Sequence, residues 1–113
     1  MMKQFELWLA NLNPSKGTEP GKIRPVVVIQ TNLLNQVDHP STLVCPLTTQ
    51  VTAKKNILRV RISEGNFGLE KDSEILIDQI RSLDNRRFLE KLGDLGQKEI
   101  VELRSKVKAI LDL

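Results

Sequence analysis

Residues 22–30 read Lys-Ile-Arg-Pro-Val-Val-Val-Ile-Gln, so that one arginine stands directly before a run of β-branched side chains. A short, continuous apolar run of this kind is typical of a strand buried on both faces. Pro25 biases Arg24 toward an extended conformation, which holds the guanidinium at the mouth of that strand. Because arginine stays charged, a cation in this place needs an anion to hold. Taken alone, the stretch favours a structural Arg24 paired with a carboxylate such as Glu19.

Length and composition indicate a single globular domain, residues 1–113. The chain is 40% hydrophobic and 27% charged, and its net charge is +3, a mildly basic balance that suits a polyanionic partner. A domain of about this size buries roughly two thirds of its unfolded surface and needs neither disulfides nor metal to fold. Charges near Met1 stand where a signal peptide has its apolar core, and no run approaches the ~20 apolar residues of a membrane span. We therefore expect a cytoplasmic protein that does not associate with membranes.

Alternation and turn residues predict five or six short strands. The Gly- and Pro-rich residues 13–22 separate the first two strands and are expected to form a mobile loop. Residues 57–62 alternate as in a half-buried antiparallel strand, whereas Pro46 suggests an edge or a bulge in the third strand. The predicted strands lie within residues 5–12, 25–30, 42–48, 57–62, 73–83 and 86–92.

A C-terminal helix is predicted from residue 97 onward, with Gly96 as its N-cap and Glu99 in its first turn. One face of this helix repeats apolar residues: Ile100, Leu103, Val107, Ile110 and Leu111. Short strands punctuated by Gly and Pro, followed by one helix, indicate a mainly β fold and a small barrel. We expect a C2 homodimer to cover the apolar residues that such a small barrel leaves, such as Val44, Leu47, Ile75 and Leu111.

Metal, nucleotide and triad chemistry find little support in the sequence. His39 and Cys45 are the only residues of their types, and no Gly-rich phosphate loop precedes a helix. Cys45 lies inside an apolar segment and is expected to be a core residue rather than a nucleophile. Four acidic residues are spread over a loop and a strand, which we expect them to solvate: Glu70, Asp72, Glu74 and Asp78. We therefore expect no cofactor and no metal.

The remaining chemistry is polar and cationic. A set of this kind can bind a phosphodiester and stabilise an anionic transition state without metal. RNA makes that useful, because it carries its own nucleophile, the 2′-hydroxyl. The set comprises Arg24, Thr48, Thr49, Asp78, Gln79, Arg81, Arg86 and Arg87.

An ordered series of motifs resembles the MazF/PemK/Kid-type toxins, the mRNA interferases of type II toxin–antitoxin systems. The series runs over nearly the whole chain, and its specificity lies in the order and spacing of the pieces. The pieces are Trp8, Leu12-Asn13-Pro14-x-x-Gly17-x-Glu19, Arg24-Pro25-Val26-Val27-Val28-Ile29, Pro46-Leu47-Thr48, Gly68-Leu69-x-x-Asp72-Ser73, Asp78-Gln79-Ile80-Arg81 and Arg86-Arg87. One departure is Asn11-Leu12-Asn13-Pro14, where the family often has Asp-Leu-x-Pro; it leaves the catalytic pair intact.

The resemblance implies a small SH3-like β-barrel of the PemK/CcdB toxin type with a C-terminal helix, forming a homodimer inhibited by a cognate antitoxin. It implies metal-independent, sequence-specific cleavage of single-stranded RNA, which leaves a 2′,3′-cyclic phosphate (or 3′-phosphate) and a 5′-hydroxyl. The catalytic Arg and Thr of the family map to Arg24 and Thr48. The residues expected to bind RNA are Lys16, Thr18, Glu19, Asp78, Gln79 and Arg81.

Three points remain open at the level of sequence. Thr48 is a poor base, and Glu19 is the candidate proton acceptor. The choice of RNA motif is expected to depend on the shape of loops 13–22 and 51–56. The main alternative function is a non-catalytic toxin that poisons DNA gyrase by binding it, as CcdB does; a third is an inactive homologue or an RNA-binding chaperone.

Overall fold

The central strand of the fold is β3 (Ser41–Thr48), which pairs with β2 on one side and with β6 and then β5 on the other. The computed structural model describes residues 2–13, 17–18, 22–54 and 56–113. In it the strands are joined in the order β4-β5-β3-β2-β1-β7, with β6 paired to β3. The other elements are β1 (Glu6–Asn11), β2 (Ile23–Val28), α1 (Asn32–Asn35), β4 (Arg59–Ile62), β5 (Ser73–Leu76), η1 (Ile77–Gln79), β6 (Arg81–Asp84), η2 (Asn85–Arg87), β7 (Phe88–Asp94) and α2 (Gln97–Leu111).

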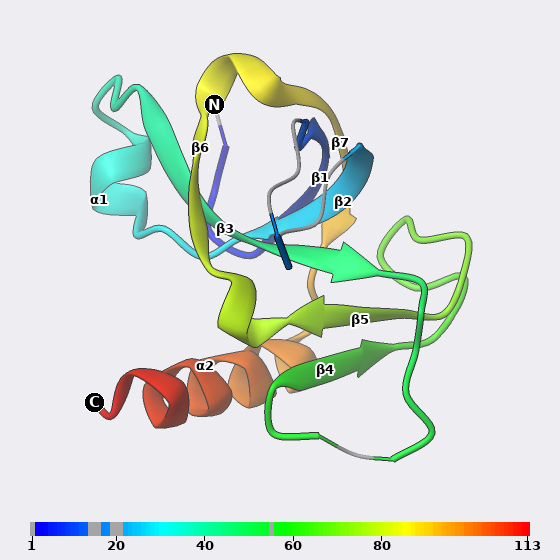
Figure 1. The fold of residues 1–113 in the computed structure, drawn as a ribbon. Helices are drawn as coiled ribbons and strands as arrows, with labels where there is room; N and C mark the ends of the chain where they lie inside the picture. The colour runs from blue at the N-terminus through cyan, green and yellow to red at the C-terminus, as the bar shows by residue number, and fades with distance from the viewer. Residues whose placement is uncertain (1, 14–16, 19–21, 55) are drawn as a thin grey trace.

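The sheet closes on itself because one stretch of chain joins its two sides. Strand β6 pairs with β3, and β7 pairs with β1. Only the three residues of η2 separate β6 from β7, so this segment arches from one side of the sheet to the other (Figure 1). The result is a small, mainly β barrel with a C-terminal helix, as the sequence predicts. Strands β4 and β5 extend the sheet beyond the end of β3.

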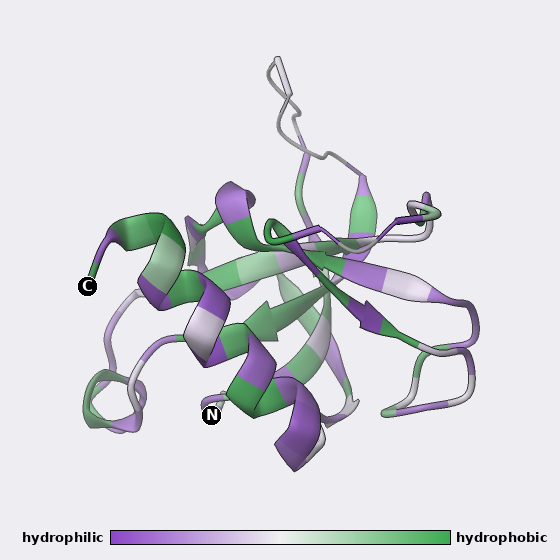
Figure 2. Cartoon of the chain, turned by 90° about the horizontal axis from the view of Figure 1, so that it is seen from below, coloured by the Kyte–Doolittle hydropathy of each residue, from purple (hydrophilic) through white to green (hydrophobic). Residues whose placement is uncertain are grey.

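The valines of β2 serve two hydrophobic cores, which explains why the run is apolar on both faces. Val26 and Val28 pack inside the barrel with Leu12, and Val27 packs on the other side with Leu7. The second core lies under α2, which crosses the sheet when the molecule is seen from below (Figure 2). Side chains on one face of α2 contact this core: Ile100, Leu103, Val107 and Ile110.

The helix begins and ends close to its predicted bounds, with Gly96 as N-cap and Glu99 in the first turn. Leu111, which the periodicity places on the apolar face, is 52% exposed. In the part of the chain that the structure describes, no helix is long and apolar enough to cross a bilayer.

Three structural expectations are wrong. Residues 73–83 form two strands rather than one, because the 3-10 turn Ile77–Gln79 redirects the chain from β5 to β6. Of the two alternatives for Pro46, an edge or a bulge, the edge is wrong, because Pro46 lies in the central strand, between the end of the β6 ladder at Val44 and the start of the β5 ladder at Leu47. The missing N–H of Pro46 is tolerated on that side of β3, because neither the β6 ladder nor the β5 ladder includes this residue.

The third error concerns the apolar residues assigned to a dimer interface. Val44, Leu47 and Ile75 are at most 1% exposed and belong to the cores of this chain itself. Of the four residues named, only Leu111 is on the surface. A homodimer would therefore have to use other side chains.

Two glycines provide a matched test of the packing between loop 63–72 and β7. Gly65 and Gly68 both have positive φ, +83° and +84°, but a Cβ at Gly68 would lie 2.1 Å from the carbonyl oxygen of Leu92, whereas one at Gly65 would meet open space. Gly65→Ala should cost only the backbone strain, about 1–3 kcal/mol. Gly68→Ala should cost a further 1–3 kcal/mol or so from overpacking. Urea denaturation of both variants measures the difference; equal losses would contradict the close approach.

Candidate active site

The register of the sheet sets three polar residues in one row across three strands. Thr48 of β3 is opposite Glu74 of β5, and Glu74 is opposite Arg61 of β4. Cross-strand partners share a face and lie within about 5.5 Å, so this row is contiguous. The β2–β3 ladder ends where Val26 stands opposite Pro46, and Arg24 and Thr48 lie two residues beyond that pair on the two strands.

A cavity of about 170 Å³ lies at the β3 end of this row, beside the start of β2. Arg24 and Thr48 both line it, so the structure brings together the two residues that the family resemblance assigns to catalysis. Arg24 is half-buried and Thr48 is 8% exposed, which fixes both on the rigid sheet. The other lining residues are Lys22, Ile23, Pro25, Leu47, Thr49 and Ser73. A phosphate in this cavity would meet a guanidinium and hydroxyl groups, a donor set suited to phosphate oxygens.

A second cavity of about 320 Å³ continues from the first one and shares Pro25, Thr49 and Ser73 with it. Its walls combine Leu9, Leu69 and Leu92 with the charged residues Glu70, Lys71 and Glu90. The site therefore adjoins a larger recess with an apolar wall, against which a flat, weakly polar base could pack while its phosphate lies beside Arg24.

The hydroxyl of Thr48 is held by the backbone that follows it. The amide N–H of Gln50 donates to Oγ1 of Thr48 at 3.1 Å. The carbonyl oxygen of the same residue, Gln50, accepts from Nη1 of Arg59 at 3.0 Å. Both sides of this turn are thus fixed, and the Oγ1 atom keeps its proton available for donation.

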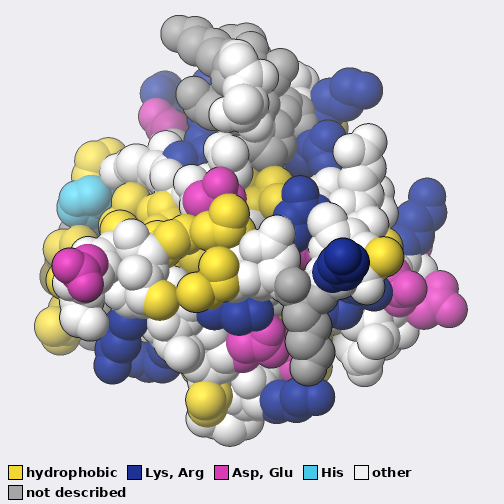
Figure 3. Space-filling model, turned by 60° about the horizontal axis from the view of Figure 1, so that its bottom comes forward, with side chains coloured by type: hydrophobic (Ala, Val, Ile, Leu, Met, Phe, Trp, Pro, Cys, Tyr) yellow, Lys and Arg dark blue, Asp and Glu magenta, His cyan; other side chains and the backbone are white. Residues whose placement is uncertain are grey.

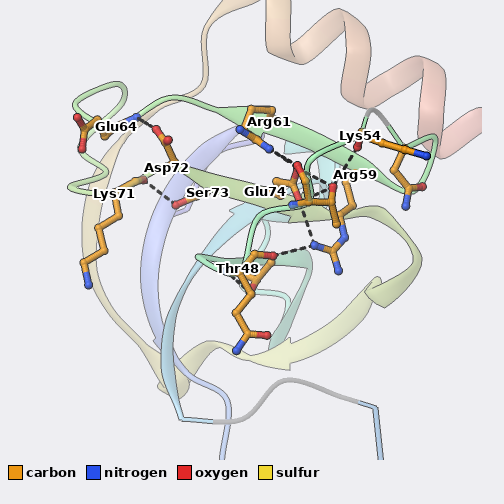
Figure 4. Close-up of polar contacts among 12 residues, drawn as sticks. Thr48, Lys54, Arg59, Arg61, Glu64, Lys71, Asp72, Ser73 and Glu74 are labelled. Carbon is orange, nitrogen blue, oxygen red and sulfur yellow. Dashed lines mark hydrogen bonds and ion pairs between the residues drawn. The ribbon is translucent and has the colours of Figure 1, made fainter.

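Glu74 is the anchor of this turn (Figure 4). Its side chain is 5% exposed and forms ion pairs with Arg59 at 2.9 Å and Arg61 at 3.1 Å. Its Oε1 also accepts from the amide N–H of Thr52 at 3.0 Å, and Oε2 accepts from the Thr52 hydroxyl at 3.2 Å. Burial raises the pKa of this carboxyl, but the hydrogen bonds from Arg59, Thr52 and Arg61 outweigh that effect and leave the pKa below its ordinary value.

The expectation that Glu74 solvates its strand is therefore wrong. The carboxylate is buried because two arginines on the neighbouring strand and the 50–52 turn converge on it. Arg59 and Arg61 alternate with apolar residues along β4. This alternation was the feature of the sequence that could have indicated two arginines on one face, ready to bind a carboxylate. The sequence could not say which acidic residue faces them, because that depends on the register between β4 and β5.

Other predicted residues lie apart from the cavity. Asp78 is exposed on η1 and Gln79 is half-buried beside it, while Arg81 stands opposite Val44 on β3. Val44 and Thr48 are four positions apart on β3, or about 13 Å of extended strand. None of the three side chains lines the cavity that Arg24 and Thr48 share.

Loop 13–22 carries the remaining candidates. Lys16 and Glu19 lie outside the described residues, and Thr18 is exposed. The two ends of the loop are joined where Asn13 Oδ1 accepts from the amide N–H of Lys22 at 2.6 Å. This hydrogen bond holds the start of β2, and with it Arg24, close to the end of β1.

Cys45 and His39 take no part in this site. Burial, with the nearby charge of Asp78, raises the pKa of the Cys45 thiol to about 12, which keeps it protonated and unreactive. The Nδ1 atom of His39 lies 2.7 Å from the carbonyl oxygen of Ser41 in a turn. Among the residues that the structure describes, no three His, Cys, Asp or Glu side chains gather where they could hold a metal ion.

Comparison with known proteins agrees with this geometry. The family model described as PemK-like, MazF-like toxin of type II toxin–antitoxin system matches residues 3–111. A curated protein named Endoribonuclease MazF from Staphylococcus saprophyticus is 38% identical over 113 residues, which are 100% of this chain and 93% of that protein. A second Endoribonuclease MazF, from Staphylococcus epidermidis, is 35% identical over the same share of each chain.

Solved structures agree as well. The crystal structure of MazF from Deinococcus radiodurans has a TM-score of 0.81 and 28% identity, covering 99% of this chain and 97% of that one. A MazE–MazF structure from the same organism has a TM-score of 0.76 and 28% identity, covering 99% and 96%.

The barrel and its site thus define a toxin of the kind found in type II toxin–antitoxin systems. The chain belongs to the PemK-like, MazF-like toxin family, which confirms the resemblance seen in its sequence.

Proposed function

We propose that this protein is an endoribonuclease, the toxin of a type II toxin–antitoxin pair, and that it cleaves single-stranded mRNA at short sequence motifs without metal. The observation that carries the proposal is the meeting of Arg24 and Thr48 in one cavity of a MazF-like barrel. The curated relatives are named endoribonucleases, which favours RNA cleavage over the gyrase-binding alternative. A cytoplasmic location is part of the proposal, because mRNA is the proposed substrate.

The reaction uses the nucleophile that RNA itself carries. The 2′-oxygen attacks the adjacent phosphorus, the bond from phosphorus to the 5′-oxygen breaks, and the 2′-hydroxyl proton leaves for a base. The products are a 2′,3′-cyclic phosphate and a 5′-hydroxyl, whose oxygen takes up a proton. Every atom of the reaction comes from RNA and solvent, so the protein has to orient the phosphate and stabilise its charge.

Arg24 is the main source of that stabilisation. Its planar guanidinium can donate two parallel hydrogen bonds to the phosphate oxygens as negative charge builds up on them. Its half-buried position at the start of β2 restricts its movement, so little reorganisation is needed at the moment of reaction. Lys22, on the same wall, adds positive charge at the entrance.

Thr48 is proposed to act as a hydrogen-bond donor. Since its Oγ1 already accepts from the Gln50 amide, its hydroxyl proton is the part left to face the phosphate or the 2′-oxygen. The proton acceptor is proposed to be Glu19 of loop 13–22. The apolar recess beside Leu9 and Leu92 is proposed to take a base next to the cleaved bond.

More distant contacts complete the proposed RNA site. Asp78, Gln79 and Arg81 are proposed to read bases or bind backbone several nucleotides from the cleaved bond, and Lys16 and Thr18 to contact RNA from loop 13–22. Each bidentate base contact would be worth about 1–3 kcal/mol of discrimination, by analogy with groove readout.

Two protein partners are proposed. One is a cognate antitoxin, which the MazE–MazF structure of the Deinococcus relative supports. The other is a second copy of the chain. Leu33, Val37 and Leu43 are 79%, 62% and 40% exposed near the histidine-bearing turn, and hydrophobic side chains gather beside the histidine in Figure 3. These residues replace Val44, Leu47 and Ile75 as candidates for a C2 interface.

The first test of this function is cleavage of a long single-stranded RNA in EDTA. We expect cuts at a recurring short motif, with 2′,3′-cyclic phosphate and 5′-hydroxyl ends, because the nucleophile belongs to the RNA and the charge is stabilised by Arg24. Mapping of the cut ends measures this. A requirement for Mg²⁺ or Mn²⁺, or cuts that leave 5′-phosphates, would contradict the mechanism.

The second test separates the roles of Arg24 and Thr48. Arg24→Ala should lose most cleavage, and Arg24→Lys should recover little, since a point charge cannot replace the planar fork. Thr48→Val keeps the shape and removes the hydroxyl, so the cleavage rate should fall about 10²–10³-fold, as for an oxyanion-hole donor, with little change in melting temperature. Single-turnover kinetics and thermal melts measure both. A Thr48→Val protein that melts early and cuts normally would make Thr48 purely structural.

A further inference from the structure

We infer that Glu74 is a positioning residue, which holds the Thr48 hydroxyl in place through Arg59 and the backbone of Gln50. The inference rests on the proposed function, because it concerns the geometry of the same reaction. It adds a residue that does not contact the substrate. Glu74 stands directly opposite Thr48 in the β3–β5 ladder, and it is 4% exposed.

A continuous chain of hydrogen bonds leads from the carboxylate to the hydroxyl. Oε1 of Glu74 binds Nη1 of Arg59 at 2.9 Å, and the same nitrogen donates to the carbonyl oxygen of Gln50 at 3.0 Å. The amide of Gln50 then donates to Thr48 Oγ1 at 3.1 Å. Each step fixes the next, so the direction of the Thr48 hydroxyl depends on where Arg59 is held.

The same carboxylate fixes the turn from its other side. Glu74 accepts from both the amide and the hydroxyl of Thr52, and Arg61, which also binds Glu74, donates to the carbonyl oxygen of Thr52. Residues 50 and 52 are therefore tied to one buried charge. Without that charge, two arginines would stand beside the turn with their partner gone, and the turn would lose its anchor on the sheet.

Glu74 is unsuited to being the proton acceptor of the reaction. A carboxylate has about four acceptor positions. Arg59, Arg61 and the amide of Thr52 occupy three of them, and the Thr52 hydroxyl has its single proton within reach of both Glu74 and the carbonyl oxygen of Lys54. A buried carboxylate bound by two guanidinium groups, with its pKa below the ordinary value, is a weak base, so we assign the contribution of Glu74 to the residues that it holds.

Three of the five described cations that line the large groove beside this network, Arg59, Arg61 and Lys106, are bound to groups of the chain itself, whereas Lys54 and Lys98 also line it. The groove has a volume of about 660 Å³ and lies between β4, residues 52–54 and 56, and α2. Arg59 and Arg61 are bound to Glu74, and Lys106 donates to Glu102 and to the carbonyl oxygen of Arg59, both at 2.7 Å. These cations hold the chain together, which supports a positioning role for the cluster.

The test is a double-mutant cycle between Glu74→Gln and Thr48→Val, read as single-turnover cleavage in EDTA. Glu74→Gln keeps the shape and removes the charge, and should slow cleavage about 10- to 100-fold in the wild-type background, the cost of misplacing a catalytic group. In the Thr48→Val background it should have no further effect, because its action passes through the missing hydroxyl. An equal slowing in both backgrounds, or no slowing in either, would overturn the inference.

Two further variants make the test specific. Asp94→Asn removes the same charge from an exposed carboxylate on β7, paired with Lys91 at 3.2 Å, and should cut at the normal rate. Arg59→Gln breaks the link at its middle while Arg61 still pairs with Glu74, and should reproduce the slowing seen for Glu74→Gln. Normal cleavage by Arg59→Gln would overturn the inference even if Glu74→Gln were poorly folded.

Amide hydrogen exchange provides a measurement independent of RNA. In Glu74→Gln the Gln50 amide should exchange at least 10-fold faster, while the amide of Val27, in the core of the sheet, keeps its protection. Unchanged exchange at Gln50 would overturn the positioning role. If the wild-type protein cut no RNA, the proposed function would fail, and the Gln50 amide would still report whether Glu74 holds the turn.

Discussion

The site depends on one constraint, the register in which β2, β3, β5 and β4 pair. That register sets Thr48, Glu74 and Arg61 in a single row and brings Arg24 to the same end of β3, where it lines a cavity with Thr48. A slip of one residue in any of these pairings would send the following side chains to the opposite face. The row therefore survives only because the apolar residues between its members fix the register: Val26 and Val28 belong to one core, and Val27 and Ile75 to the other.

The two ends of this arrangement have different roles. At the β2 end, Arg24 and Thr48 line a small cavity, which is the proposed place of the phosphate. At the β4 end, Glu74 and the arginines of β4 satisfy one another and fasten residues 50–52. A buried carboxylate between two arginines contributes little net stability in many proteins, whereas it fixes geometry strongly. Its value here is the orientation of Thr48 rather than the stability of the fold.

Much of the fold could be predicted from the sequence, because local signals determine it. The valine run, the alternation of residues 57–62 and the Gly96-capped helix all appear in the structure near their predicted places. The break at residues 77–79 could not be predicted, since Ile77 and Ile80 continue the apolar pattern on both sides of Asp78 and Gln79 and no Gly or Pro marks the turn. For the same reason Val44, Leu47 and Ile75 were assigned to an interface: apolarity is visible in a sequence, but the surface that covers each side chain is not.

The functional site also contains residues that the sequence identified and residues that it did not. Arg24 and Thr48 were found through the family motifs, and the structure unites them across 24 residues of sequence. Glu74 was missed because its importance comes from a cross-strand register and not from any local motif. Asp78, Gln79 and Arg81 form a compact motif in sequence. In the structure Asp78 and Gln79 lie on η1 and Arg81 lies opposite Val44, outside the cavity that Arg24 and Thr48 line.

The account is tested most directly by a crystal structure with a short RNA that spans the mapped cleavage motif and carries a 2′-O-methyl group at the attacking position. With the nucleophile blocked, the RNA should remain intact. We expect the cleavable phosphate in the cavity of Arg24 and Thr48, within hydrogen-bond distance of both, with the Gln50 amide still donating to Thr48. A phosphate bound elsewhere, such as in the groove beside α2, with the Arg24 cavity empty of RNA, would contradict it.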